Sequence, residues 1–180
     1  MNIVNSLKIA KFVNCKFMLK IQTGKENPIL RTVSKPVPEV TKKTLKLIKE
    51  MEVALDLEKG VGIAAPQVGE NVRIFLALLD QKHLVAMINP EFLTHNEILA
   101  SAEEGCLSLP GEWGQVERYT EVTIRFLDVK GRENTLKLKG FNARVVQHEM
   151  DHLDGILFTD HVKQEANFLQ MPKLPETERL

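Results

Sequence analysis

Two histidines late in the chain are spaced to bind one metal ion. His148 and His152 lie four residues apart in the run His-Glu-Met-Asp-His, and on a helix this spacing places two side chains one turn apart on the same face. Val145, Val146 and Leu153 give the same stretch an apolar face, which indicates a buried helix. Because a buried polar cluster must be paired, hydrogen-bonded or coordinated, the motif predicts a metal site.

A catalytic metal site of this kind needs a third protein ligand and keeps one position for water. Cys106 is one candidate, since a thiolate is a good soft ligand and the preceding Gly105 permits a close approach of the backbone. His161 is a second candidate, just beyond the motif, whereas His83 and His95 are interpreted as surface histidines. Spacing alone leaves both Cys106 and His161 open.

The composition is that of a globular domain. The chain has 180 residues, of which 43% are hydrophobic and 27% charged, and its 24 basic residues balance its 24 acidic ones. Without an excess of Lys and Arg, nucleic acid is not expected as a partner. No apolar run approaches the roughly 20 residues that span a bilayer, and no secretory signal is recognised. We therefore expect a cytoplasmic protein with no membrane partner, whose two cysteines, Cys15 and Cys106, are reduced.

The hydrophobic pattern predicts the elements that position these residues. A period near 3.6 predicts an amphipathic helix over 39–58, and short apolar runs predict strands over 72–79 and 84–88. Alternation predicts a hairpin over 116–140, and the histidines fall in a helix over 141–153. Strands that gather before a single inner helix favour an α+β fold, with antiparallel β-sheets packed around a central metal-binding helix and an amphipathic helix nearer the N-terminus.

Glycine and proline are expected to set the boundaries of these elements. Gly60 and Gly62 should end the first helix, Asn89-Pro90 should close the first pair of strands, and Gly155 should stop the metal-binding helix.

The chain is expected to form one domain over residues 18–180. Residues 1–17 contain three lysines and no acidic residue. We interpret them as an extension that is disordered or arises from an upstream start codon. An import peptide for an organelle is the less favoured interpretation.

Three sequence motifs occur in a fixed order along the chain. They are Gly-Val-Gly-Ile-Ala-Ala-Pro-Gln at 60–67, Glu-Gly-Cys-Leu-Ser at 104–108 and Gln-His-Glu-Met-Asp-His-Leu at 147–153. Together they resemble the G-x-G-x-A-A-x-Q, E-G-C-L-S and Q-H-E-x-D-H motifs of peptide deformylases, and the similarity runs from about Met18 to Phe158. The resemblance implies a bacterial-type hydrolase that removes the formyl group from the N-terminal formyl-methionine of nascent polypeptides and releases formate.

The resemblance also implies which residues bind the metal. Cys106, His148 and His152 would hold it, with water in the fourth position. The family typically uses Fe²⁺, and Zn²⁺, Ni²⁺ or Co²⁺ can take its place. Ligand softness is compatible with several of these ions and does not choose among them.

The implied catalytic residues are Glu149, Gln67 and Leu107. Glu149 would take a proton from the attacking water and deliver it to the departing amine. The side-chain amide of Gln67 and the backbone N–H of Leu107 would stabilise the oxyanion. Asp151 is expected to orient the motif through a hydrogen bond.

Substrate recognition in relatives combines backbone pairing with an apolar pocket for methionine. The residues expected to contact the substrate are Val61 and Gly62 along the backbone, Phe141 and Val145 in the pocket, Glu104 at its rim, and Gly105. Core packing explains the two apolar residues equally well. Some bacterial relatives dock on the ribosome through a long basic C-terminal helix, whereas residues 163–180 are short, broken by proline and mixed in charge, so ribosome contact is weakly supported.

Two other functions fit part of the pattern. A His-Glu-x-x-His metallopeptidase would cut internal peptide bonds, but its third ligand is usually a His or Glu downstream of the helix. A non-catalytic module stabilised by metal would generally use four protein ligands, and only three are evident here.

Overall fold

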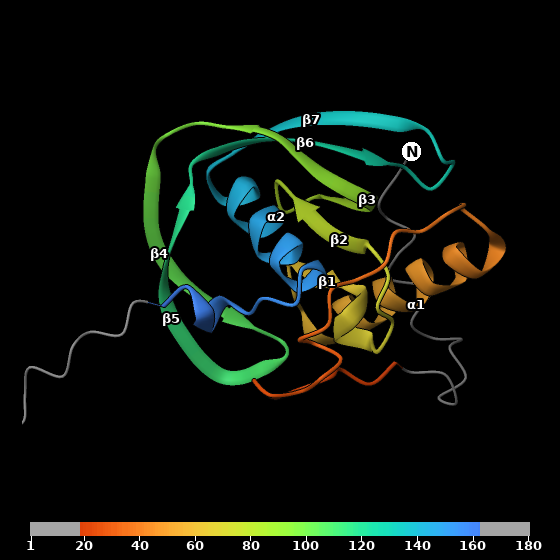
Figure 1. Ribbon diagram of the computed structural model, residues 1–180, viewed down its shortest axis with the longest axis horizontal. Helices are drawn as coiled ribbons and strands as arrows, with labels where there is room; N and C mark the ends of the chain where they lie inside the picture. Colours follow the sequence, from red (N-terminus) through yellow and green to blue (C-terminus); the bar gives the residue numbers. More distant parts are fainter. Residues whose placement is uncertain (1–18, 163–180) are drawn as a thin grey trace, which may run out of the picture.

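The computed structural model describes residues 19–162, so the extension expected over 1–17 and the segment 163–180 lie outside the described residues (Figure 1). The helices are α1 (Lys42–Glu58) and α2 (Gly140–Leu153), with short 3-10 turns η3 (Ala65–Val68) and η4 (Phe158–Asp160). The strands are β1 (Gly62–Ala64), β2 (Ile74–Leu79), β3 (His83–His95), β4 (Leu99–Cys106), β5 (Leu109–Tyr119), β6 (Glu121–Leu127) and β7 (Glu133–Lys139). No helix in this part of the chain is both long and apolar enough to span a membrane.

The strands form two antiparallel sheets around helix α2. A five-stranded sheet has the order β1-β2-β3-β6-β7, and β4 and β5 pair only with each other. Figure 1 shows α2 at the centre of the molecule, with the five-stranded sheet along one side, the β4–β5 sheet along another and α1 at the outside. The predicted α+β architecture around a central helix is therefore confirmed.

Helix α2 is held by its apolar face. Val146 and Met150, one turn apart, pack into a buried cluster that includes Phe75 of β2 and Ile124 of β6. The helix stops as predicted before Gly155, whose φ of +73° favours glycine, and a Cβ there would lie 2.7 Å from a backbone oxygen of the chain.

Helix α1 covers the other side of the five-stranded sheet. It begins at the capping residue Thr41 and buries Ile48, Met51 and Leu55 in a second apolar cluster with strands β1 to β3. Its end differs slightly from the prediction, because Lys59 rather than Gly60 takes the left-handed conformation after the last turn.

The pairing of β2 with β3 ends at Ile88, as predicted from Asn89-Pro90, but strand β3 itself continues to His95 instead of ending at residue 88. Asn89 adopts a φ of +49°, which asparagine tolerates, and its side chain bonds the N–H and C=O of Val37 at 2.7 and 2.8 Å. The register shifts between Ile88 and Glu91, and the strand then continues on β6. A β-bulge accommodates a proline that a regular central strand would exclude.

The predicted hairpins are present, but one sheet was missed. β2 and β3 pair around the turn at 80–82, and β6 and β7 pair around the turn at 128–132, as the alternation indicated. The stretch 116–119, assigned to the second hairpin, belongs instead to β5. The β4–β5 sheet, which carries Cys106, was not predicted as a sheet.

Replacement of Ile124 by alanine tests the core beneath the site. Ile124 is fully buried on the face of β6 toward α2, so Ile124→Ala should lower the free energy of unfolding by about 2–5 kcal/mol. Thr123→Ala, on the opposite face of the same strand, should change it by less than about 1 kcal/mol. Urea denaturation of both variants measures the difference, and equal losses would contradict this description of the core.

Candidate metal centre

The structure brings together one sulfur and two imidazoles from distant parts of the chain. Cys106 is the last residue of β4, and His148 and His152 project from successive turns of α2. One ligand atom from each lies within 4.8 Å of the other two, and Cys106 Sγ is 3.2 Å from His152 Nε2. The other candidate, His161, is not part of this group, because its Nε2 bonds Asp151 Oδ2 at 2.9 Å.

The orientation of His148 is set by a carboxylate behind it. Its Nδ1 lies 3.0 Å from Glu104 Oε2, so Nε2 is the atom left to face the site. Burial alone would lower the pKa of His148, but the Cys106 sulfur and the Glu104 carboxylate raise it to about 10. These surroundings therefore favour a positive charge on the His148 ring.

The pKa of His152 is shifted in the opposite direction. Burial, together with repulsion by His148 and Arg118, lowers its pKa well below the ordinary value, so its imidazole is neutral and in the form that binds metal. His152 Nδ1 and Glu149 Oε2 are buried and find no hydrogen-bond partner among residues 19–162. A soft sulfur beside two imidazole nitrogens, with unpaired polar atoms around them, fits a divalent ion of the Fe²⁺, Zn²⁺, Ni²⁺ or Co²⁺ type.

Glu149 lies beside these three residues and is only 4% exposed. Burial, reinforced by the negative charges of Glu104 and Asp151, raises its pKa to about 7, against a lowering effect of His148. A carboxyl group with this pKa can exchange a proton near neutral pH, as a general base must.

Gln67 reaches the same cysteine from a different part of the chain. It is 1% exposed in η3, and its Oε1 accepts a hydrogen bond of 2.8 Å from the N–H of Ala64. Its Nε2 therefore faces the site, donating to Ser108 Oγ at 3.2 Å and lying 3.5 Å from Cys106 Sγ. Leu107, half-buried, follows Cys106 directly, so its backbone belongs to the same loop.

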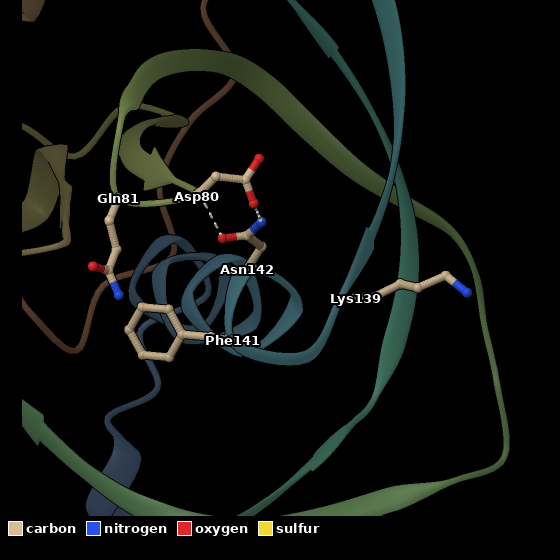
Figure 2. A pocket seen from close by; sticks show the side chains of 5 residues that line it. All are labelled: Asp80, Gln81, Lys139, Phe141 and Asn142. Carbon is tan, nitrogen blue, oxygen red and sulfur yellow. Dashed lines mark hydrogen bonds between the residues drawn. The ribbon is translucent and has the colours of Figure 1, made fainter.

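The residues expected to contact substrate lie in three different settings. Val61 is exposed and leads into Gly62, the first residue of β1, while Val145 is buried in the core. Phe141 is 52% exposed and lines a hollow of about 360 Å³ at the start of α2, together with Asp80, Gln81, Lys139 and Asn142. Figure 2 shows its ring beside Gln81, with Asp80 and Asn142 bonded to each other and Lys139 directed away.

Glu104 is buried rather than placed at an open rim. Its two oxygens accept hydrogen bonds from Arg118 Nε and Nη2, Arg144 Nη1 and His148 Nδ1, all between 2.7 and 3.0 Å. Burial would raise the pKa of Glu104, but the bonds from His148 and Arg118 and the charge of Arg118 hold it well below the usual range. Asp151 joins this network by accepting a bond from Arg118 Nη1.

The sequence interpretation missed Arg118 and Arg144. An arginine on a strand or on a mixed helix face is usually a solvated charge, and nothing in the local pattern marked these two as partners of a buried carboxylate. The only available signal was their position near the cysteine and histidine motifs.

An α+β fold that brings a cysteine from a strand to two histidines and a buried glutamate on an inner helix is that of a metal-dependent hydrolase. The family described as polypeptide deformylase matches residues 18–168. This chain therefore belongs to the polypeptide deformylase family.

Individual relatives agree with this assignment. The chain is 47% identical over 137 residues to the peptide deformylase of Halothermothrix orenii, which covers 76% of this chain and 88% of the relative. It is 41% identical over 153 residues to that of Pseudothermotoga lettingae, covering 85% and 88%.

Solved structures share the fold as well. The crystal structure of peptide deformylase from Thermotoga maritima superposes with a TM-score of 0.78 at 36% identity, covering 82% of this chain and 99% of that one. The peptide deformylase from Synechococcus elongatus in complex with actinonin gives 0.78 at 35% identity, covering 82% and 80%.

The contact between Gly62 and Glu149 gives a prediction. A Cβ on Gly62 would lie 2.3 Å from Glu149 Oε1, so Gly62→Ala must displace the carboxylate. Since a misplacement of about 1 Å can cost roughly 10²-fold, kcat should fall by about that factor. Steady-state kinetics measures the fall, and metal content should stay at the wild-type level because no ligand is touched. Wild-type kcat would show that Glu149 does not need its present position.

Proposed function

We propose that the chain removes the formyl group from N-formylmethionyl nascent peptides with one divalent ion held by Cys106, His148 and His152. The observation that carries the proposal is the convergence of these three ligand atoms within 4.8 Å, beside the buried Glu149. When bound, such an ion lowers the pKa of the attacking water from roughly 16 toward about 7.

Glu149 is the general base and acid in this proposal. Its carboxylate takes the proton of the attacking water and later gives it to the nitrogen of methionine as the C–N bond breaks and formate leaves. Its pKa of about 7 suits both transfers, since the group must be ionised in one step and protonated in the next.

Gln67 and Leu107 stabilise the oxyanion that forms on the formyl carbon. The Ala64 N–H occupies Gln67 Oε1, which leaves Nε2 as a donor aimed at the site before substrate arrives. The backbone N–H of Leu107 is the second donor. Donors positioned in advance cost no reorganisation during the reaction.

The substrate is proposed to lie between the backbones of two segments. Val61 and Gly62 pair with the peptide on one side and Gly105 on the other, and Phe141 and Val145 form the wall for the methionine side chain. Glu104 sits behind His148 with all its oxygens bonded within the chain, so we assign it to orienting that ligand.

Fe²⁺ is the proposed resident ion, with Zn²⁺, Ni²⁺ or Co²⁺ able to replace it, because a mixed sulfur and nitrogen donor set suits all four. The curated relatives are bacterial, which supports a cytoplasmic site of action on newly made chains, with residues 18–180 as the catalytic domain.

Formate release tests the reaction. Protein loaded with Fe²⁺ without air should release formate from a formyl-Met peptide, and Glu149→Gln should reduce kcat by about 10²–10⁴-fold because the base is lost. Glu91→Gln, an exposed glutamate on β3, is the matched control and should behave as wild type. Cleavage of internal peptide bonds would indicate a metallopeptidase instead, and full metal content without hydrolysis a structural module.

Metal retention tests the ligand set separately from activity. Cys106→Ser should lower the metal content after dialysis against a chelator, since a hydroxyl is a much poorer soft ligand than a thiolate. Cys15→Ser is the control and should retain the wild-type amount. The protein must be kept from air, because a thiolate at an iron site is prone to oxidation. Equal metal content in both variants would mean that another residue completes the site.

A further inference from the structure

Arg144 connects the metal-binding helix to both strands of the β4–β5 sheet. It lies one turn before His148 on α2, with a side chain only 12% exposed. Its Nη1 donates to Glu104 Oε1 at 2.7 Å and to the carbonyl oxygen of Val116 at 2.9 Å, and its Nη2 donates to the carbonyl oxygen of Ala100 at 2.6 Å. One guanidinium thus bonds β4 twice and β5 once. The proposed reaction makes no use of it.

The metal centre needs such a connection because its ligands lie on two elements that are not paired with each other. Cys106 is on β4, which pairs only with β5, while both histidines are on α2. The β4–β5 sheet joins the five-stranded sheet at one corner, where the N–H of Asn96 donates to the carbonyl oxygen of Glu121 and the N–H of Thr120 to that of Ile98, and Cys106 lies at the opposite end of β4. The distance from sulfur to imidazole therefore depends on side-chain contacts between β4–β5 and α2.

Arg144 also completes the environment of the carboxylate behind His148. A carboxylate offers about four acceptor positions, and on Glu104 these are filled by two bonds from Arg118, one from His148 and one from Arg144. Loss of the Arg144 bond would leave one position open and let the carboxylate rotate. The Nδ1 of His148 would then lose its fixed partner.

We infer that Arg144 is a positioning residue, which holds Cys106 at the correct distance from His148 and His152 and so sets the affinity of the centre for its metal ion. The inference rests on the proposed metal site. The fork of the guanidinium is essential, because lysine is a single point donor and reaches one of the three acceptors at a time.

A purely structural role for Arg144 would give a different result. Loss of stability alone leaves the metal affinity of the folded protein unchanged at temperatures where nearly all of it is folded. Loss of positioning lowers that affinity, and removal of groups that orient metal ligands typically costs about 10–100-fold.

Titration of the metal-free protein with Co²⁺ separates the two roles. The absorption band from thiolate to cobalt reports Cys106 in the coordination sphere, and the titration gives the affinity. Arg144→Gln should bind Co²⁺ about 10–100-fold more weakly than wild type, well below the unfolding temperature of each protein. Arg125→Gln is the matched control, since this exposed arginine on β6 pairs with Glu91 away from the site, and it should bind as wild type.

Arg144→Lys keeps the inference testable if the glutamine variant does not fold. The lysine variant keeps the charge, and its affinity should fall between those of wild type and Arg144→Gln. Wild-type affinity in a folded Arg144→Gln, or in Arg144→Lys where only that variant folds, would overturn the inference while leaving the proposed site intact. A wild-type protein that gives no cobalt–thiolate band would overturn both.

Discussion

The arrangement of the whole centre depends on one buried anion, the carboxylate of Glu104. A charge at this depth is strongly unfavourable unless it is paired and hydrogen-bonded. Arg118, Arg144 and His148 fill its acceptor positions, and these donors come from β5 and α2 while Glu104 itself is on β4. Removal of one partner from a buried ion pair costs about 3–5 kcal/mol, so the three elements are constrained to meet at this point.

Helix α2 can position the residues of this centre because one of its faces packs in the apolar core and the other makes hydrogen bonds to the β4–β5 sheet. The apolar face joins the core beneath the five-stranded sheet, which fixes the height and rotation of the helix. The polar face meets β4–β5, where Gln147 bonds both the N–H and the C=O of Tyr119 at 3.1 and 2.9 Å. Because the apolar contacts are non-directional and the polar ones are directional, the second set determines where the ligands point.

The sequence predicted those elements whose apolar residues recur with the period of a helix or a strand. Helix α2, with His148 and His152 on it, and the β6–β7 hairpin followed from apolar spacing. The β4–β5 sheet did not, because most of β4 is exposed and its pairing with β5 is set by tertiary contacts. The passage of β3 through Asn89-Pro90 depends on contacts of Asn89 with Val37, 52 residues away. For the same reason, spacing alone could not choose between Cys106 and His161, and the resemblance to a family was needed.

The two buried glutamates show how one small site shifts the pKa of the same side chain in opposite directions. Glu104 is surrounded by donors and cations, which hold its pKa well below the usual range, so it remains an anion throughout the working pH range. Glu149 is buried at least as deeply, but its Oε2 has no partner among the described residues, and burial raises its pKa to about 7. Environments that push the pKa values of two carboxyl groups apart separate a fixed charge from a proton carrier. In the proposed reaction Glu149 moves a proton, and pairing as complete as that of Glu104 would remove this capacity. The proposal therefore gives a functional reason for the incomplete pairing of Glu149.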